Sequence, residues 1–343
     1  MAKRRKLKSY LDRRAQALER QRQRRLNRLY NGSTLPLNRQ SRSNLAARAT
    51  DIHNAPRTLS LAANTEEVVS FFNGVKVSYS KGHKIALDLT DVAVLTPDAI
   101  IYMLSQMDYY ERRYGRTSVS GNVPDDLNCR KLFVMSGFMK YVHFVGQLPA
   151  SDTDVLTIER GAEVKNDIAT QVVTFAREKL GAQRASGSKS VYRIIVESMG
   201  NTREHAYDET AVAPNWYLIA QNHPTSERVS FAFLDGGAGI PATVRKKLTE
   251  EMRQQLSLLP GLKIESEDAK MIMSAFAGKI HRSKTRKGYR GRGLPGIYKI
   301  LESGLIDNLI VISGFGYVDY RNNKVLELKL PFEGTLILWD FLP

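Results

Sequence analysis

The segment ESMGNTREHA, residues 197–206, places Glu197, Asn201 and His205 at successive four-residue intervals. An α-helix has about 3.6 residues per turn, so these side chains share one face of the helix that we expect over residues 190–208. A carboxylate and an amide one turn apart suit a bound water and a hard, oxygen-preferring cation such as Mg²⁺. The segment therefore predicts a helix that carries a polar, cation-binding face.

Three further segments follow in order along the chain. The expected strand RVSFAFLD (228–235) runs into DGGAGI (235–240), where an acid at a strand end is followed by a glycine-rich turn. Such a turn lets a flat ligand approach the backbone closely. GRGL (291–294) opens a helical run, and a glycine-rich helix start suits a phosphate. GT (334–335) begins the last expected strand.

These four segments, within about residues 155–343, resemble the N box and the three glycine boxes of the GHKL (Bergerat-fold) ATP-binding family, which includes histidine kinases and the large heat-shock chaperone. The resemblance implies an α/β fold whose C-terminal part is a two-layer sandwich, a mixed sheet with helices on one face. It also implies ATP and Mg²⁺ as cofactors. One departure is that Pro295 follows Leu294 where the second glycine box has its closing glycine.

By this resemblance Asn201 would coordinate Mg²⁺, and Glu197 would orient or deprotonate the attacking water. Asp235 would accept a hydrogen bond from the adenine amino group, with Thr335 nearby through a water. Residues 241–290 would form the ATP lid. The remaining expected cofactor-binding residues are Gly237, Gly239, Ile240, Arg290, Gly291, Arg292, Gly293 and Leu294.

Residue composition and hydrophobic periodicity predict the order of the other secondary-structure elements. We expect strands over 68–80, 84–95, 216–223, 228–235, 308–314, 317–321, 324–331 and 334–341. Helices are expected over 96–115 and 166–181, a mixed helix–strand element over 132–145, a loop over 185–190 and a helical insertion over 241–287. The domains we expect are an arm and linker (1–58), a small α/β domain (59–150) and the ATP-binding domain (151–343).

The second of these domains has a weaker resemblance. KIALDLTDVAVLTPDAIIYML (84–104) resembles the strand–turn–helix of a STAS (anti-sigma-factor-antagonist-like) domain. The phosphorylatable residue of that family is absent, because Pro97 and Asp98 stand in its place. Asp98 is either a mimic of a phosphorylated residue or an ordinary first-turn acid, with Thr96 as the helix N-cap.

The positive charge is concentrated at the N-terminus. The chain has a formal net charge of +16, of which 16 Lys/Arg and three acids place +13 in residues 1–60. A basic helix is expected over 9–30 and a linker over 31–58. This arm either binds nucleic acid or an acidic partner, or it is a solvated segment that packs on the body or on another subunit.

Several classes of protein are excluded. The sequence contains no apolar run of the roughly 18–20 residues that span a bilayer, and the basic start leads into no secretory signal, so we expect a cytoplasmic location. The single cysteine, Cys129, excludes an intramolecular disulfide.

Three functions remain open. The first is a slow Mg²⁺-dependent ATPase whose lid closure switches a protein partner or a homodimer in a bacterial regulatory or phage-defence (antiviral) system. The second is an anti-sigma-like serine/threonine protein kinase. The third is a non-hydrolysing nucleotide-gated module that binds nucleic acid through residues 1–58.

Overall fold

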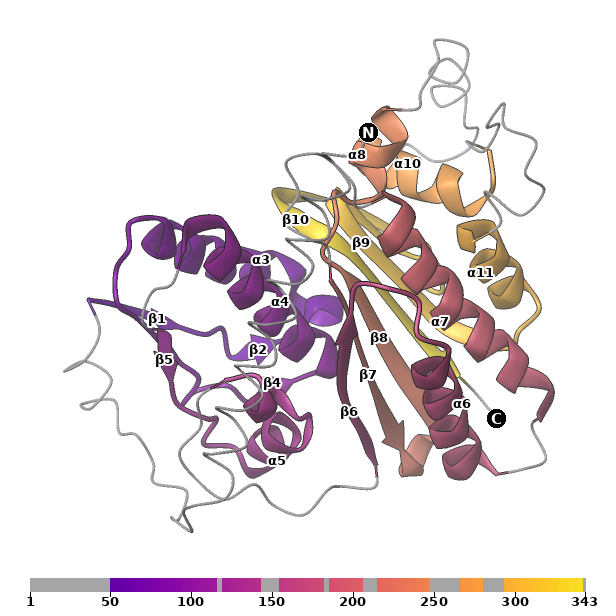
Figure 1. Ribbon diagram of the computed structural model, residues 1–343, viewed down its shortest axis with the longest axis horizontal. Coiled ribbons are helices and arrows are strands. Elements are labelled where there is room, and N and C mark those ends of the chain that lie inside the picture. Colours follow the sequence, from indigo (N-terminus) through magenta and orange to yellow (C-terminus); the bar gives the residue numbers. More distant parts are fainter. Residues whose placement is uncertain are drawn as a thin grey trace, which may run out of the picture. The chain divides into compact units, whose positions relative to one another are not determined.

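The computed structural model (Figure 1) describes residues 50–115, 119–142, 154–181, 185–205, 215–246, 266–279 and 293–341. The expected helix over 9–30, most of the linker, the boundary near residue 150 and much of the expected lid lie outside these residues. The described parts of residues 40–138 and 151–343 belong to one compact unit, and every contact described below lies within it.

A five-stranded sheet forms the centre of this unit. Its order is β6 (Val155–Gly161), β7 (Trp216–His223), β8 (Arg228–Asp235), β10 (Lys324–Phe341) and β9 (Ile306–Asp319). All four pairings are antiparallel, so the expectation of a mixed sheet is wrong. The reason is that β8 and β9 run in the same direction but do not pair, because β10 returns from β9 and inserts between them.

The strands expected over 216–223 and 228–235 are confirmed as β7 and β8. The single strand expected over 84–95 is wrong, because β3 (Ile85–Asp88) and β4 (Val94–Leu95) are separate strands in different sheets. β7 and β8 form the expected hairpin through a short turn at Pro224–Ser226. The four short strands expected at the C-terminus merge into β9 and β10. Glycines at 314 and 334 coincide with shifts in the β9–β10 register, so they mark bulges within continuous strands.

One face of the sheet is covered by α6 (Asn166–Leu180), α7 (Ala185–His205), α10 (Glu267–Phe276) and α11 (Gly293–Glu302) (Figure 1). The core there includes Trp339 stacked on Phe231 at 5.1 Å between ring centroids. α7 begins at Ala185, so the loop expected over 185–190 is wrong. Gly187 is required for close packing, because a Cβ there would lie 2.4 Å from the Phe341 ring. Within the described segments no helix is long and apolar enough to cross a bilayer.

The opposite face is covered by α3 (Leu61–Ser80) and α4 (Pro97–Tyr114), which come from the expected 59–150 domain. The described helices of residues 151–343 lie on one face, as expected, but the sheet has helices on both faces. The Tyr217 hydroxyl of β7 donates to Asp108 of α4 at 2.8 Å, and Tyr102 of α4 stacks on Phe332 of β10 at 4.6 Å. Tyr217 and Ile219 point to this face and are buried, as are their β7 neighbours on the other face. A strand that is apolar on both faces is typical of a sheet with two covers.

Helix α3 replaces the strand expected over residues 68–80. The buried side chains recur at helical spacing: Leu61, Thr65, Val68, Phe72, Val75 and Tyr79. Ser60 caps the helix by accepting from the Ala63 amide, and the Asp98 carboxylate accepts from the Leu61 amide at 2.7 Å. The β-branched composition of this segment suggested a strand, but its period of three to four residues determines the outcome.

The remaining elements surround α3 and α4. β1 (Asp51–Asn54), β3 (Ile85–Asp88) and β5 (Val119–Gly121) form a parallel sheet, and β2 (Thr58–Leu59) pairs with β4 (Val94–Leu95). β1 and β2 fall within the expected linker, which is therefore partly wrong. α5 (Leu127–Met135) and a 3₁₀ turn, η1 (Phe138–Lys140), are the described part of the mixed element expected over 132–145.

Candidate functional site

A small cavity lies where α7, β8, α11 and β10 meet. Its volume is about 60 Å³, and it is lined by Ser198, Asn201, Phe233, Asp235, Ala238, Gly239, Ile240, Thr243, Leu294, Thr335 and Ile337. Six of the expected cofactor-binding residues are in this lining: Asn201, Asp235, Gly239, Ile240, Leu294 and Thr335. The structure therefore brings together side chains from all four sequence motifs.

Asp235 and Thr335 are neighbours through strand register. They are paired residues of β8 and β10, which places the acid at the end of a central strand next to the threonine. Ser313 of β9 completes this arrangement: its hydroxyl donates to the Gly334 carbonyl at 2.7 Å, lies 3.1 Å from the Thr335 hydroxyl and accepts from the Ile240 amide at 3.0 Å. Ser313 is fully buried and was missed by the sequence analysis, although a serine within the apolar run LIVIS is a usable signal.

The environment of the Asp235 carboxyl group disfavours its ionised form. Burial raises its pKa from 3.8 to about 6, although the Gly237 amide, which donates to Oδ1 at 2.9 Å, and the Thr202 hydroxyl act in the opposite direction. An additional hydrogen-bond donor would stabilise the ionised form of a carboxyl group in this environment. Asp235 is therefore suited to accept an N–H from a ligand.

Glu197 and Asn201 lie against the start of α11. A Cβ at Gly293 would lie 3.2 Å from Glu197 Oε2 and 3.1 Å from Asn201 Oδ1, so this glycine permits the close approach of α11 to α7. The Asn201 Nδ2 atom is buried and has no hydrogen-bond partner within the described residues. Arg193, one turn before Glu197, lies 3.9 Å from its carboxylate and borders Gly296.

Not every predicted residue lines the small cavity. Glu197 and Gly293 lie beside it, and Gly237 faces a second cavity. Arg290, Gly291 and Arg292 lie outside the described residues, as does the His205 side chain. The phosphate contacts expected from the second glycine box therefore stay predictions.

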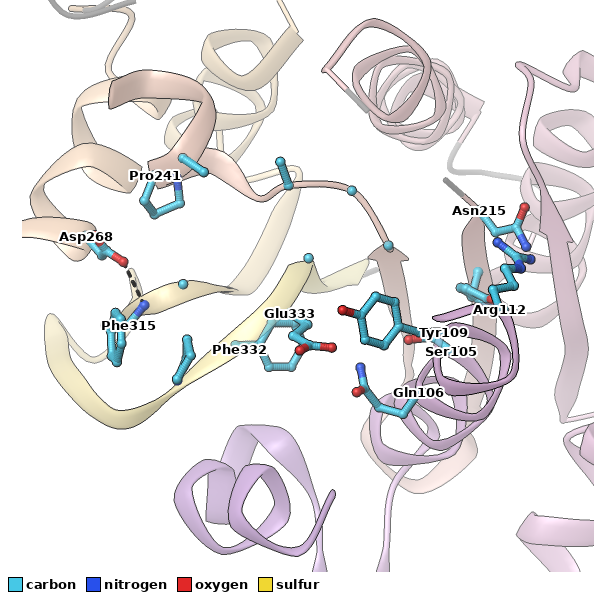
Figure 2. A pocket seen from close by; sticks show the side chains of 18 of the residues that line it. Ser105, Gln106, Tyr109, Arg112, Asn215, Pro241, Asp268, Phe315, Phe332 and Glu333 are labelled. Carbon is cyan, nitrogen blue, oxygen red and sulfur yellow. Dashed lines mark hydrogen bonds between the residues drawn. The ribbon is translucent and has the colours of Figure 1, made fainter. Parts of the chain in front are cut away.

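The second cavity, shown in Figure 2, is larger, with a volume of about 350 Å³. Residues from α4, the glycine-rich turn, α8 (Ile240–Arg245), α10 and the β9–β10 strands line it, and Ala238 lines both cavities. The sequence analysis did not find this cavity. No local motif could have indicated it, because its walls come from segments more than 200 residues apart.

The Asp98 side chain has a structural role. It is 5% exposed and accepts hydrogen bonds from the first backbone amides of α3, those of Leu61 and Ala62. Thr96 occupies the N-cap position of α4, but its side chain makes no capping hydrogen bond. These contacts explain an acid at residue 98 without a phosphorylation-like function.

No protein-family model matches the chain, and no curated protein matches it. The family resemblance therefore depends on the four sequence motifs alone.

Proposed function

We propose that the chain binds ATP together with Mg²⁺ at the small cavity and hydrolyses it slowly. One observation carries this proposal: Asn201, Asp235, Leu294 and Thr335, which come from four separate motifs, line one cavity, and Glu197 lies at its border. A concave site lined by an acid, an amide and a hydroxyl from separate segments is the arrangement expected of a ligand-binding site.

The residues present suit the proposed ligands. Asp235, whose partly buried carboxyl group has a raised pKa, would accept a hydrogen bond from the amino group of adenine. The Asn201 amide, whose buried nitrogen has no hydrogen-bond partner among the described residues, would turn its oxygen to Mg²⁺. Bound Mg²⁺ would supply neutralisation of phosphate charge. Glu197 would then hold a water in line and accept its proton.

The proposed lid motion follows from the size of the cavity. Ligand pockets usually enclose about 300–1,000 Å³, whereas this cavity measures about 60 Å³, with Leu294 of α11 in its lining and Gly293 packed on α7. Entry of ATP would therefore displace the start of α11. We propose that this displacement signals to a protein partner or second copy of the chain, in a regulatory or antiviral system.

Turnover of γ-labelled ATP by the full chain, with and without Mg²⁺, tests the proposal. Free phosphate that is lost in Asp235→Asn and in Glu197→Gln supports an ATPase, whereas label on protein identifies a kinase. Binding without turnover identifies a nucleotide-gated module. Asp167→Asn and Glu178→Gln, both exposed on α6, are the matched controls. Absence of ATP binding would refute the proposal.

A nucleic-acid interaction of the arm stays a separate prediction. Because β1 and β2 belong to the folded unit, the arm should be removed at residue 49 and not at residue 58. Loss of salt-dependent DNA or RNA binding on this truncation would support phosphate contacts by the arm.

A further inference from the structure

The larger cavity contains polar side chains without hydrogen-bond partners. Gln106 of α4 is 3% exposed and lines the cavity, yet its amide makes no hydrogen bond with any residue that the structure describes. The Glu333 Oε2 atom of β10 is also buried and has no partner within the same residues. Figure 2 shows the Gln106 amide and the Glu333 carboxylate directed into the same part of the cavity, beside Tyr109. Unpartnered buried polar groups are costly, so this arrangement suits a ligand that supplies the missing bonds.

The charge of Glu333 is already balanced. Its other oxygen, Oε1, accepts a hydrogen bond from Lys76 of α3. The Lys76 ammonium also lies 5.7 Å from the centre of the Tyr109 ring. A second cation would therefore gain little at Glu333. An uncharged N–H donor is better suited to the remaining oxygen.

The walls favour a flat ligand. Phe332 is held in place by its stacking on Tyr102, and the Tyr109 ring borders the same space. Phe315, with 39% of its surface exposed, stands at the edge of the cavity. Aromatic side chains pack well on planar rings. The volume of about 350 Å³ is within the usual range for small-molecule sites.

We propose that this cavity binds a planar ring with a lactam edge, of the kind found in guanine and uracil. The ring N–H donates to Glu333 Oε2, and the adjacent carbonyl accepts from the Gln106 amide. Adenine and cytosine offer an N–H only from their amino groups, so they fit only with the ring turned over, whereas methylation of the lactam nitrogen removes the donor altogether. The cavity therefore requires an N–H at this edge of the ring and rejects 3-methyluracil, independently of the proposed ATP cavity.

Calorimetric titration of the full chain with guanosine, uridine and 3-methyluridine tests this requirement. We expect guanosine and uridine to bind at least about 10-fold more tightly than 3-methyluridine, as the loss of a hydrogen bond to a charged group implies. Nucleosides are used because they lack the phosphates that would add Mg²⁺-dependent binding. Equal binding of uridine and 3-methyluridine, or binding of no nucleoside, would overturn the proposal.

Two variants locate the ligand. Glu333→Gln and Gln106→Leu should each weaken guanosine binding by roughly 10-fold or more, whereas Gln171→Leu, an exposed control on α6, should not. Melting curves verify that each variant folds. Asp235→Asn should remove any adenosine binding at the small cavity and leave guanosine binding unchanged. Guanosine binding that survives Glu333→Gln but is lost in Asp235→Asn contradicts the proposal and leaves the ATP proposal standing.

Discussion

Replacing Asp235 with asparagine should stabilise the folded protein, and by an amount that grows with pH. The carboxyl pKa is about 6 in the folded state and 3.8 in the reference state. Below pH 3.8 the carboxyl group is protonated in both states, so its burial does not lower the free energy of unfolding through ionisation. As the pH rises from 3.8 through 6, the unfolded chain ionises freely while the folded chain resists, so the wild type loses stability over this window.

The magnitude follows from the size of the pKa difference. About two pKa units correspond to about 3 kcal/mol at most. The side chain lines the cavity and keeps some contact with solvent, which screens part of the effect, so we expect about 1–2 kcal/mol. Asparagine has nearly the same shape and does not ionise, so Asp235→Asn avoids this cost at neutral pH.

Urea unfolding of the wild type and of Asp235→Asn at pH 4 and at pH 7.5 measures the effect. The quantity of interest is the difference in unfolding free energy between the two proteins, in which the titration of all other groups cancels. Asp167→Asn, at an exposed position, should give a difference that does not change with pH. A flat difference for Asp235→Asn, within about 0.5 kcal/mol, would refute the inference that burial perturbs this carboxyl group.

Four further predictions concern ligand binding and stability. ATP should bind roughly 10-fold more tightly at pH 7 than at pH 5, because ionised Asp235 is the proposed acceptor; a pH-independent calorimetric affinity would count against this role. Glu197→Gln should leave ATP affinity unchanged and lower turnover by about 10²–10⁴-fold, measured as phosphate release. Gly334→Ala should cost about 2 kcal/mol or more in urea unfolding, because its Cβ would lie 2.0 Å from the Asp235 carbonyl oxygen. Gly82→Ala, also at positive φ but in open space, should cost only about 1 kcal/mol. Asp98→Ala should cost about 1–2 kcal/mol in the same assay, since the first amides of α3 lose their acceptor.

The sequence was sufficient to predict those helices and hairpins that depend on residues close together in the chain. The helix over 166–180 follows from its apolar spacing, and Gly181 ends it at a φ of 86°. The hairpin of β7 and β8 follows from the turn residues between two apolar runs. The meeting of Asp235 with Thr335 also agrees with the order of the motifs, because strand ends of one sheet come together in register.

Contacts between distant segments could not be read from local pattern. The bond between Lys76 and Glu333 joins residues 257 positions apart, and nothing near either residue indicates the other. The packing of α3 and α4 on the second face of the sheet also depends on contacts between segments that are far apart in the sequence. β7 carried the relevant signal in its unbroken apolar run, WYLIA, but a run of this kind does not identify which helices cover it.

The glycines of the 235–239 turn are weaker support for a nucleotide site than the side chains around it. A Cβ at Gly239 would lie 2.7 Å from Ser313 Oγ and 3.0 Å from the Gly334 carbonyl oxygen. These contacts belong to the packing of the turn on β9 and β10, and they require glycine whether or not a ligand approaches. Loss of ATP binding after substitution of Gly239 would therefore report only disturbed packing. Asp235→Asn and Glu197→Gln preserve the shape of each side chain and remove only its carboxylate. They therefore test the role of the carboxylate in ATP binding and hydrolysis, whereas glycine variants test the packing of the turn.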